Sequence, residues 1–226
     1  MTGDTEISEP KEQRPGNSQA QWTVKKKLWK RAFSSTEGEK LSGKKDRGVA
    51  WRIYLNQLPI DIPLKNFHQN NGAKILPFAG FNMPINYKTG IINEHKNVRN
   101  HSGIFDVSHM GQILIENNES YLHKLEKYIP LQLKKLIKNR SHYSFLLNKD
   151  GGVIDDLIIS NIDIKDKPYL YIVYNAPRKK EDEEIFISCA PNAEKIYNKN
   201  CLFAIQGPDS INVLKNIIDI PNKMNF

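Results

Sequence analysis

Two adjacent carboxylates, Asp155 and Asp156, lie within a run of branched apolar residues that follows the sequence Lys-Asp-Gly-Gly. Asp-Gly and Gly-Gly between two apolar runs are strong local signals for a β-hairpin, so residues 153–159 are predicted to form its second strand. Successive side chains of a strand point to opposite faces, so the two aspartates face opposite sides of a sheet. A carboxylate among apolar side chains is costly unless it is paired or lies in a polar cavity. The pair therefore predicts either a carboxylate that is paired or lines a polar cavity, or one solvent-exposed aspartate beside one that caps a neighbouring backbone.

A second group of polar side chains ends the stretch Gly90–Gly111, which reads GIINEHKNVRNHSGIFDVSHMG. Its apolar residues follow helical spacing from Ile91 to Val98, which predicts an amphipathic helix with one apolar stripe. Gly103 is expected to end that helix in the left-handed conformation, and a short apolar strand then leads into a Ser-His-Met sequence. Polar groups at the end of a buried strand often line a pocket, although ordinary capping at a helix–strand joint would give the same pattern.

The rest of the chain predicts the elements that hold these side chains. Apolar runs of strand length are expected to form strands at residues 74–78, 112–115, 143–148, 153–159, 169–174 and 202–205. Helices are expected at residues 63–68, 91–98, 119–129 and 131–137, with further helices starting at Asn175 and Asp209. Elements in this order pack as an α+β fold, with an open mixed β-sheet and helices against it.

Composition restricts the class of protein. The chain has 226 residues and a net charge of +8, but its first 60 residues hold 12 basic and 7 acidic residues, so the remainder is only mildly basic. This distribution does not predict a nucleic-acid-binding body. The two cysteines imply no disulfide framework, and the six histidines lack the spacing of metal ligands, so no metal site is expected. No apolar run reaches the ~18 residues that would span a bilayer.

Five blocks of sequence, in one order, together resemble the aminomethyltransferase family, the T-protein of the glycine cleavage system. They are FHQNNGAKILPFAGFNMPINY, GIINEHKNVR with GIFDVSHMG, YSFLLNKDGGVIDDLIIS, YLYIVYNA and LFAIQGP. The resemblance extends over Pro59–Phe226 and covers the first half of the family's usual length. It implies the first part of a three-domain fold around a central folate channel.

The resemblance also implies a site and a reaction. Asp156 corresponds to the catalytic acid/base, and the folate pocket would include Met110, Tyr143, Val173 and Asn175. The implied reaction moves a one-carbon unit from the aminomethyl-lipoyl arm of H-protein to the co-substrate tetrahydrofolate, with release of ammonia. Met110 and Val173 offer apolar contact to a pterin ring, Tyr143 a ring face, and Asn175 both a donor and an acceptor.

The sequence departs from the family where an Ala-Thr-Arg-like run is replaced by Pro177, Arg178 and Lys179. The resemblance leaves open which of the two cations takes the place of the arginine.

Residues 1–58 are expected to form a separate, largely disordered, basic extension of low complexity, and residues 1–21 contain almost no large apolar side chain that could repay the entropy of folding. The segment WTVKKKLWKRAFSS within it has the pattern of a basic amphipathic helix, which can be a targeting element or a membrane-surface segment. Three interpretations stay open: an internal targeting helix, a gene model that starts too early, or a solvated tail. The family implies a mitochondrial location, although four acidic residues precede this segment. Residues 59–226 are expected to form the folate-binding portion.

Two other functions stay open at this point. One is a folate-binding protein of the same fold that acts in iron–sulfur cluster assembly, and the other is a truncated fragment without catalytic activity. The FDVSHMG sequence favours the transferase.

Overall fold

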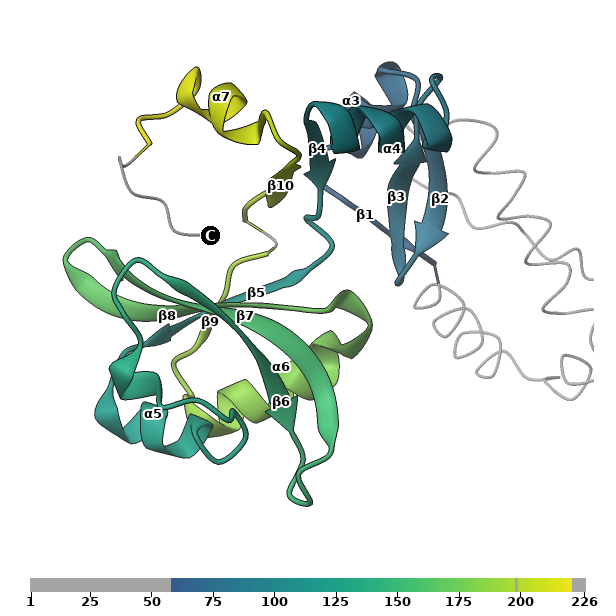
Figure 1. The fold of residues 1–226 in the computed structure, drawn as a ribbon. Coiled ribbons are helices and arrows are strands. Elements are labelled where there is room, and N and C mark those ends of the chain that lie inside the picture. The colour runs from purple at the N-terminus through teal and green to yellow at the C-terminus, as the bar shows by residue number, and fades with distance from the viewer. Residues whose placement is uncertain (1–57, 198, 221–226) are drawn as a thin grey trace, which may run out of the picture. The chain divides into compact units, whose positions relative to one another are not determined.

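The computed structural model describes residues 58–197 and 199–220, which belong to one compact unit, Leu58–Phe226 (Figure 1). The expectation of a disordered extension concerns residues that, apart from Leu58, lie outside this described part, as does the basic amphipathic segment.

A five-stranded sheet forms the larger part of the unit. Its strands are β5 (Gly111–Glu116), β6 (Ser141–Leu147), β7 (Val153–Ile164), β8 (Lys167–Tyr174) and β9 (Glu194–Lys195). Their order is β6-β7-β8-β5-β9, and every neighbouring pair is antiparallel. The predicted hairpin is confirmed, because β6 and β7 pair on either side of the Gly-Gly turn.

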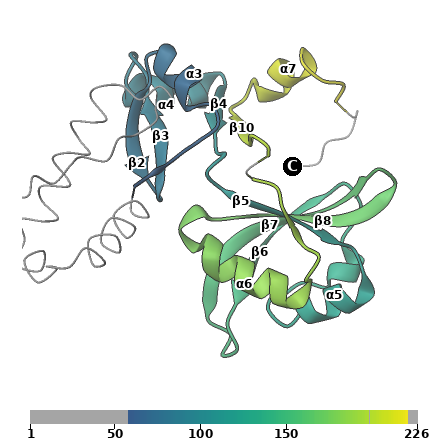
Figure 2. The same cartoon turned by 180° about the vertical axis from the view of Figure 1, so that it is seen from behind.

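One face of this sheet carries the hydrophobic core. The helices α5 (Glu119–Leu125) and α6 (Lys179–Cys189) lie on the same side of it in both views (Figures 1 and 2). Alternate strand residues point to that side, as period-two patterning requires. The fully buried side chains include Ile113, Ile115, Leu157, Ile159, Leu170, Ile172, Tyr174 and, from α6, Phe186.

The opposite face of the sheet is much less covered. Tyr143, Phe145 and Ile158 are 63%, 39% and 44% exposed, respectively. This face also holds Asp156, the second member of the predicted aspartate pair. The sheet therefore has a packed core on one side and an open surface with polar and apolar side chains on the other.

The remaining elements form two smaller sheets and three helices. A three-stranded sheet has the order β1 (Ile60–Asp61), β3 (Phe81–Asn86), β2 (Lys74–Phe78), in which β1 and β3 are parallel. A two-stranded antiparallel sheet joins β4 (Gly103–Asp106) to β10 (Phe203–Gln206). The helices are α3 (Lys65–Asn70), α4 (Ile91–Asn100) and α7 (Ser210–Lys215). The predicted α+β class is confirmed, and among the described sheets the three-stranded one combines parallel and antiparallel strands.

Two predicted helical features are wrong. Residues 131–137 contain only a 3-10 turn, η2 (Leu133–Lys135), after which Leu136 is already extended. Leu133 and Leu136 are both buried, and Leu133 donates its backbone N–H to the Glu126 carboxylate, so tertiary packing holds the segment outside a helix. The predicted helix 119–129 likewise stops at Leu125.

Gly103 does not end α4 in the left-handed conformation, because it lies in β4 and pairs with Gln206. A Cβ there would lie 2.5 Å from Val98 Cγ2, so Gly103 is needed for close approach to α4. The predicted stripe of α4 is also not buried, since Ile91 and Ile92 are 62% and 72% exposed. Among the described helices, none combines the length and the hydropathy that crossing a bilayer would require.

Candidate functional site

The side chain of Asn175 joins the two aspartates. Its Nδ2 donates to Asp155 Oδ1 and to Asp156 Oδ1, each at 2.9 Å, and its backbone N–H donates to Asp155 Oδ2 at 3.0 Å. Asp155 is buried and Asp156 is exposed, in agreement with the predicted opposite faces. Asp155 therefore caps a backbone, while Asp156 presents a carboxylate that is oriented by an amide.

Strand register explains why these groups meet. Leu157 on β7 is paired with Tyr174 on β8, so Asn175 follows the last paired residue of β8 beside the two aspartates. Asn175 then precedes the 3-10 turn η3 (Ala176–Arg178), whose Pro177 has no backbone N–H to continue a ladder. The end of β8 thus places an amide side chain beside the first residues of β7.

Tyr143 and Val173 lie in one cross-strand row on the same face as Asp156. Tyr143 is paired with Ile158, and Ile158 is paired with Val173. Phe145, two residues from Tyr143, is paired with Asp156, so Tyr143 and Asp156 are diagonal neighbours on this face. Desolvation, and then the hydrogen bonding and charge of Asp156, raise the pKa of Tyr143. The sequence-predicted residues Tyr143, Asp156 and Val173 are therefore neighbours on the open face.

The loop that carries Met110 is held by a buried hydrogen-bond network. Asp106 accepts the Ser108 backbone N–H at 2.9 Å through Oδ1, and its Oδ2 lies 2.9 Å from His68 Nε2. The Ser108 hydroxyl oxygen accepts the Leu202 backbone N–H at 3.0 Å. Buried polar groups satisfied in this way fix a single backbone path, so the network defines where Met110 stands.

Gly111 follows this loop at a point of very close approach. A Cβ there would lie 2.1 Å from the ring of Tyr174, which is completely buried against Phe186. Only glycine allows β5 to begin here without displacing that ring.

A cavity of about 310 Å³ brings the two regions together. Its lining contains Met110 and Asn175 with Asp155, and also Phe78, Ala79, His109, Ala176, Pro177 and Arg178. Asp156, Tyr143 and Val173 do not line it, but the Asn175 amide connects it directly to Asp156 on the open sheet face. The cavity thus contains two of the five predicted site residues, Met110 and Asn175, while Asp156, Tyr143 and Val173 lie on the sheet face that Asn175 links to it.

Sequence reasoning pointed to the segments of two titratable side chains next to this region but assigned neither of them a role. His109 is buried between the edges of Phe78 and Phe81, and among the described residues nothing hydrogen-bonds its Nδ1. Desolvation, and then the charge of Lys179, lowers the pKa of His109, while Asp106 opposes that shift. The imidazole is therefore favoured in its neutral form.

Lys179 is the second such residue. Its ammonium lies 3.9 Å from the ring centroid of Tyr197 and 4.5 Å from that of Phe81, a geometry that supports cation–π attraction. Burial lowers the pKa of Lys179 to about 8, partly offset by Glu183. Arg178 instead forms an exposed ion pair with Glu181 at 2.6 Å. The adjacent cations thus occupy very different environments, one between aromatic rings and one in an exposed ion pair. This difference cannot be predicted from two neighbouring basic residues in a sequence.

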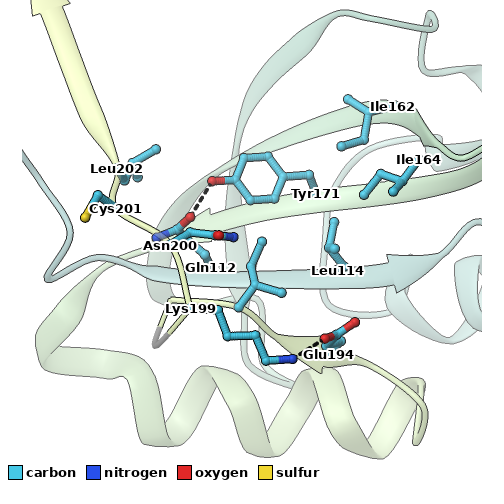
Figure 3. Close-up of a pocket in the computed structure, with 11 residues that line it drawn as sticks. Gln112, Leu114, Ile162, Ile164, Tyr171, Glu194, Lys199, Asn200, Cys201 and Leu202 are labelled. Atoms are coloured by element: carbon cyan, nitrogen blue, oxygen red, sulfur yellow. Dashed lines mark hydrogen bonds and ion pairs between the residues drawn. The ribbon is translucent and has the colours of Figure 1, made fainter. Parts of the chain in front are cut away.

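A second, larger cavity of about 600 Å³ lies over β5 and β8 (Figure 3). Figure 3 shows the Tyr171 hydroxyl directed at Gln112 and the Lys199 ammonium directed at Glu194, with bonds of 2.9 and 2.6 Å. It contains none of the predicted site residues. Within residues 58–197 and 199–220, no cluster of three or more His, Cys, Asp or Glu side chains could hold a metal ion.

The sequence was compared with known protein families. The family described as GCVT N-terminal domain matches residues 64–226. The chain belongs to this family. The resemblance expected from the five sequence blocks is therefore confirmed.

Individual relatives agree with the family. The chain is 41% identical over 164 residues to "Probable aminomethyltransferase, mitochondrial" of Schizosaccharomyces pombe, covering 69% of this chain and 41% of the relative. It is 39% identical over 163 residues to "Aminomethyltransferase" of Prochlorococcus marinus, covering 69% and 43%. It is also 36% identical to "Aminomethyltransferase, mitochondrial" of Dictyostelium discoideum, covering 70% and 41%.

Among solved structures, the chain is similar to the crystal structure of glycine cleavage system aminomethyltransferase T from Bartonella henselae. The TM-score is 0.63 and the identity 31%, over 74% of this chain and 45% of that chain. The chain therefore spans less than half the length of the relatives it matches. None of these relatives is named as an iron–sulfur assembly protein, so that alternative gains no support.

Proposed function

We propose that this chain forms the N-terminal part of an aminomethyltransferase that transfers a one-carbon unit from aminomethyl-lipoyl H-protein to tetrahydrofolate and releases ammonia. The names of its relatives support this reaction class. The observation that carries the proposal is the Asn175 amide bound to both Asp155 and Asp156 beside the cavity that Met110 lines.

Asp156 is the proposed acid/base. Its carboxylate is exposed on the open face, and one of its oxygens already accepts a hydrogen bond from Asn175. A carboxylate held in this way can accept a hydrogen bond or proton from a folate N–H, which makes that nitrogen a better nucleophile. Fixing Asp156 before the substrate arrives reduces the entropy cost of reaching a reactive geometry.

Apolar and aromatic side chains are proposed to bind the pterin. Met110 and Val173 supply apolar contact from the cavity and from the sheet, and Tyr143 supplies a ring face beside Asp156. A pterin combines a flat ring with an amide-like polar edge. The residues present fit both features, with Asn175 as the polar contact between the two regions.

The test is the Asp156→Asn variant of the 226-residue chain, with Asp150→Asn in the exposed hairpin turn as a matched control. We expect Asp156→Asn to bind tetrahydrofolate in calorimetry but to lose ammonia release in the presence of aminomethyl-lipoyl H-protein. The control should keep both. Turnover by Asp156→Asn at the rate of the control would remove Asp156 from the mechanism.

We also propose a mitochondrial location, supported by two relatives whose names include that compartment. A fluorescent protein fused to the C-terminus of the whole chain should co-localise with a mitochondrial marker. A uniformly cytosolic signal would contradict this location.

A further inference from the structure

A second acidic residue lies behind the aspartate pair, inside the core. Asp182 on α6 is fully buried, with an exposure of 0%. Within the described part of the chain, no hydrogen-bond donor reaches either of its carboxyl oxygens. The next residue, Glu183, provides a contrast because it accepts hydrogen bonds from the Tyr174 hydroxyl and the Lys195 ammonium, each at 3.0 Å. An ionised carboxylate without donors in the interior is strongly unfavourable, so Asp182 is expected to be neutral.

Asp155 shares the core face of β7 with Leu157 and Ile159, the face that α6 covers, and its carboxylate is among the groups that act on the pKa of Asp182. Both oxygens of Asp155 already accept hydrogen bonds, Oδ1 from Asn175 Nδ2 and Oδ2 from the Asn175 backbone N–H. Two carboxyl groups can stay in contact in a buried place only when they share one proton. Asp155 accepts hydrogen bonds from two donors and Asp182 accepts none, so the shared proton is more stable on Asp182.

Most of the other groups around Asp182 also favour its protonated form. Burial, then the hydrogen bond and charge of Asp155, then the charge of Glu181, raise the pKa of Asp182 to about 8. Arg178 on η3 acts in the opposite direction. Tyr174 on β8 also faces Asp182, and its own pKa is raised, first by burial.

We infer that Asp182 is a positioning residue: as a neutral acid it donates a hydrogen bond to Asp155 and holds that carboxylate against Asn175, whose amide is thereby fixed on Asp156. The Asn175 Nδ2 group has two hydrogens, and the two aspartates take one each. A shift of Asp155 would remove one of the acceptors that hold the amide and leave only the Asp156 carboxylate and backbone carbonyl as its partners, so its orientation on Asp156 would be less well fixed. The consequence for catalysis rests on the proposed function, whereas the proton on Asp182 does not.

The test combines NMR with calorimetry on the 226-residue chain. Aspartate carboxyl carbons labelled with ¹³C would be followed between pH 5 and 9, and the side-chain amide of Asn175 would be followed by its ¹H–¹⁵N signals. The variants are Asp182→Asn, which keeps a donor toward Asp155, and Asp182→Leu, which removes it. Glu184→Gln, exposed on the same helix, is the control.

In the unmodified chain and in the control, we expect one aspartate carboxyl signal to titrate near pH 8. This titration should be absent from Asp182→Asn. Asp182→Asn should leave the Asn175 amide signals in place and keep the Kd for tetrahydrofolate within about twofold. Asp182→Leu should shift those signals and weaken binding about tenfold, the effect of losing one buried hydrogen bond.

Three results overturn the inference: all aspartates titrating below pH 6, unchanged Asn175 signals in folded Asp182→Leu, or a displaced Asn175 amide in Asp182→Asn. If Asp182→Leu does not fold, the titration in Asp182→Asn still decides. If the unmodified chain binds no folate while the high titration and its loss are observed, the proposed function fails and the inference about Asp182 stands.

Discussion

Replacement of Asp182 by asparagine should stabilise the protein, although it removes a carboxyl group from the core. In the folded chain the pKa of Asp182 is about 8, and the ordinary value of an aspartate is 3.8. Because the folded pKa is raised, unfolding releases a proton between these two values. Stability from this group is therefore complete below pH 4, falls as the pH rises, and levels off above pH 8.

The size of this stability difference follows from the difference between pH 7 and the pKa of Asp182 in the unfolded chain. Each pH unit corresponds to about 1.4 kcal/mol, so keeping Asp182 protonated at pH 7 costs roughly 4 kcal/mol. Asparagine has no such cost and keeps a donor toward Asp155. We expect Asp182→Asn to be more stable than the unmodified chain by up to roughly 4 kcal/mol at pH 7, and by roughly half of that or less at pH 5.

Urea denaturation of both proteins at pH 5, 6, 7, 8 and 9 measures this difference. Other titrating groups, such as His109 and Lys179, are common to both proteins and cancel in the comparison. Glu184→Gln should show little change at any pH, because it is exposed on the same helix. A difference that stays constant from pH 5 to 8, or a less stable Asp182→Asn at pH 7, would refute the reasoning.

Two further substitutions test how the site is held. Gly111→Ala places a Cβ 2.1 Å from the buried Tyr174 ring, so we expect a loss of about 1–3 kcal/mol in urea denaturation, and an unchanged midpoint would contradict the close approach. His68→Ala leaves the buried Asp106 without its imidazole partner and should cost about 3 kcal/mol, whereas His123→Ala, exposed on α5, should cost little. Equal midpoints for the two histidine variants would show that the network around Asp106 does not stabilise the loop.

The sequence predicts most of the sheet and the arrangement of the aspartate pair. Gly-Gly turn chemistry specifies the β6–β7 hairpin, and strand periodicity alone separates Asp155 from Asp156. These features are local, since they depend on residues close together in the chain. The five blocks that resemble the aminomethyltransferase family then connect the hairpin to Met110 and Asn175.

The features that the sequence did not predict depend on packing between distant segments. Asp182 lies in the acidic run Glu181–Glu184, which resembles a solvated helix face, and its burial becomes evident only once α6 packs under the sheet. Lys179 likewise becomes distinct from Arg178 only because Phe81 and Tyr197 flank its ammonium. The wrong helix at residues 131–137 has the same origin, because a capping carboxylate and core burial override its helical spacing.

The most direct test of the folate site is a calorimetric titration of tetrahydrofolate into the 226-residue chain and into its Met110→Asp variant. Met110 lines the cavity beside Asn175, and a charge there would oppose an apolar ring without touching the aspartates. We expect saturable binding at one site in the unmodified chain and at least a tenfold loss of affinity in the variant, the effect of about 1.4 kcal/mol. Absence of binding in the unmodified chain, or equal affinities in the two proteins, would contradict a folate site at this cavity.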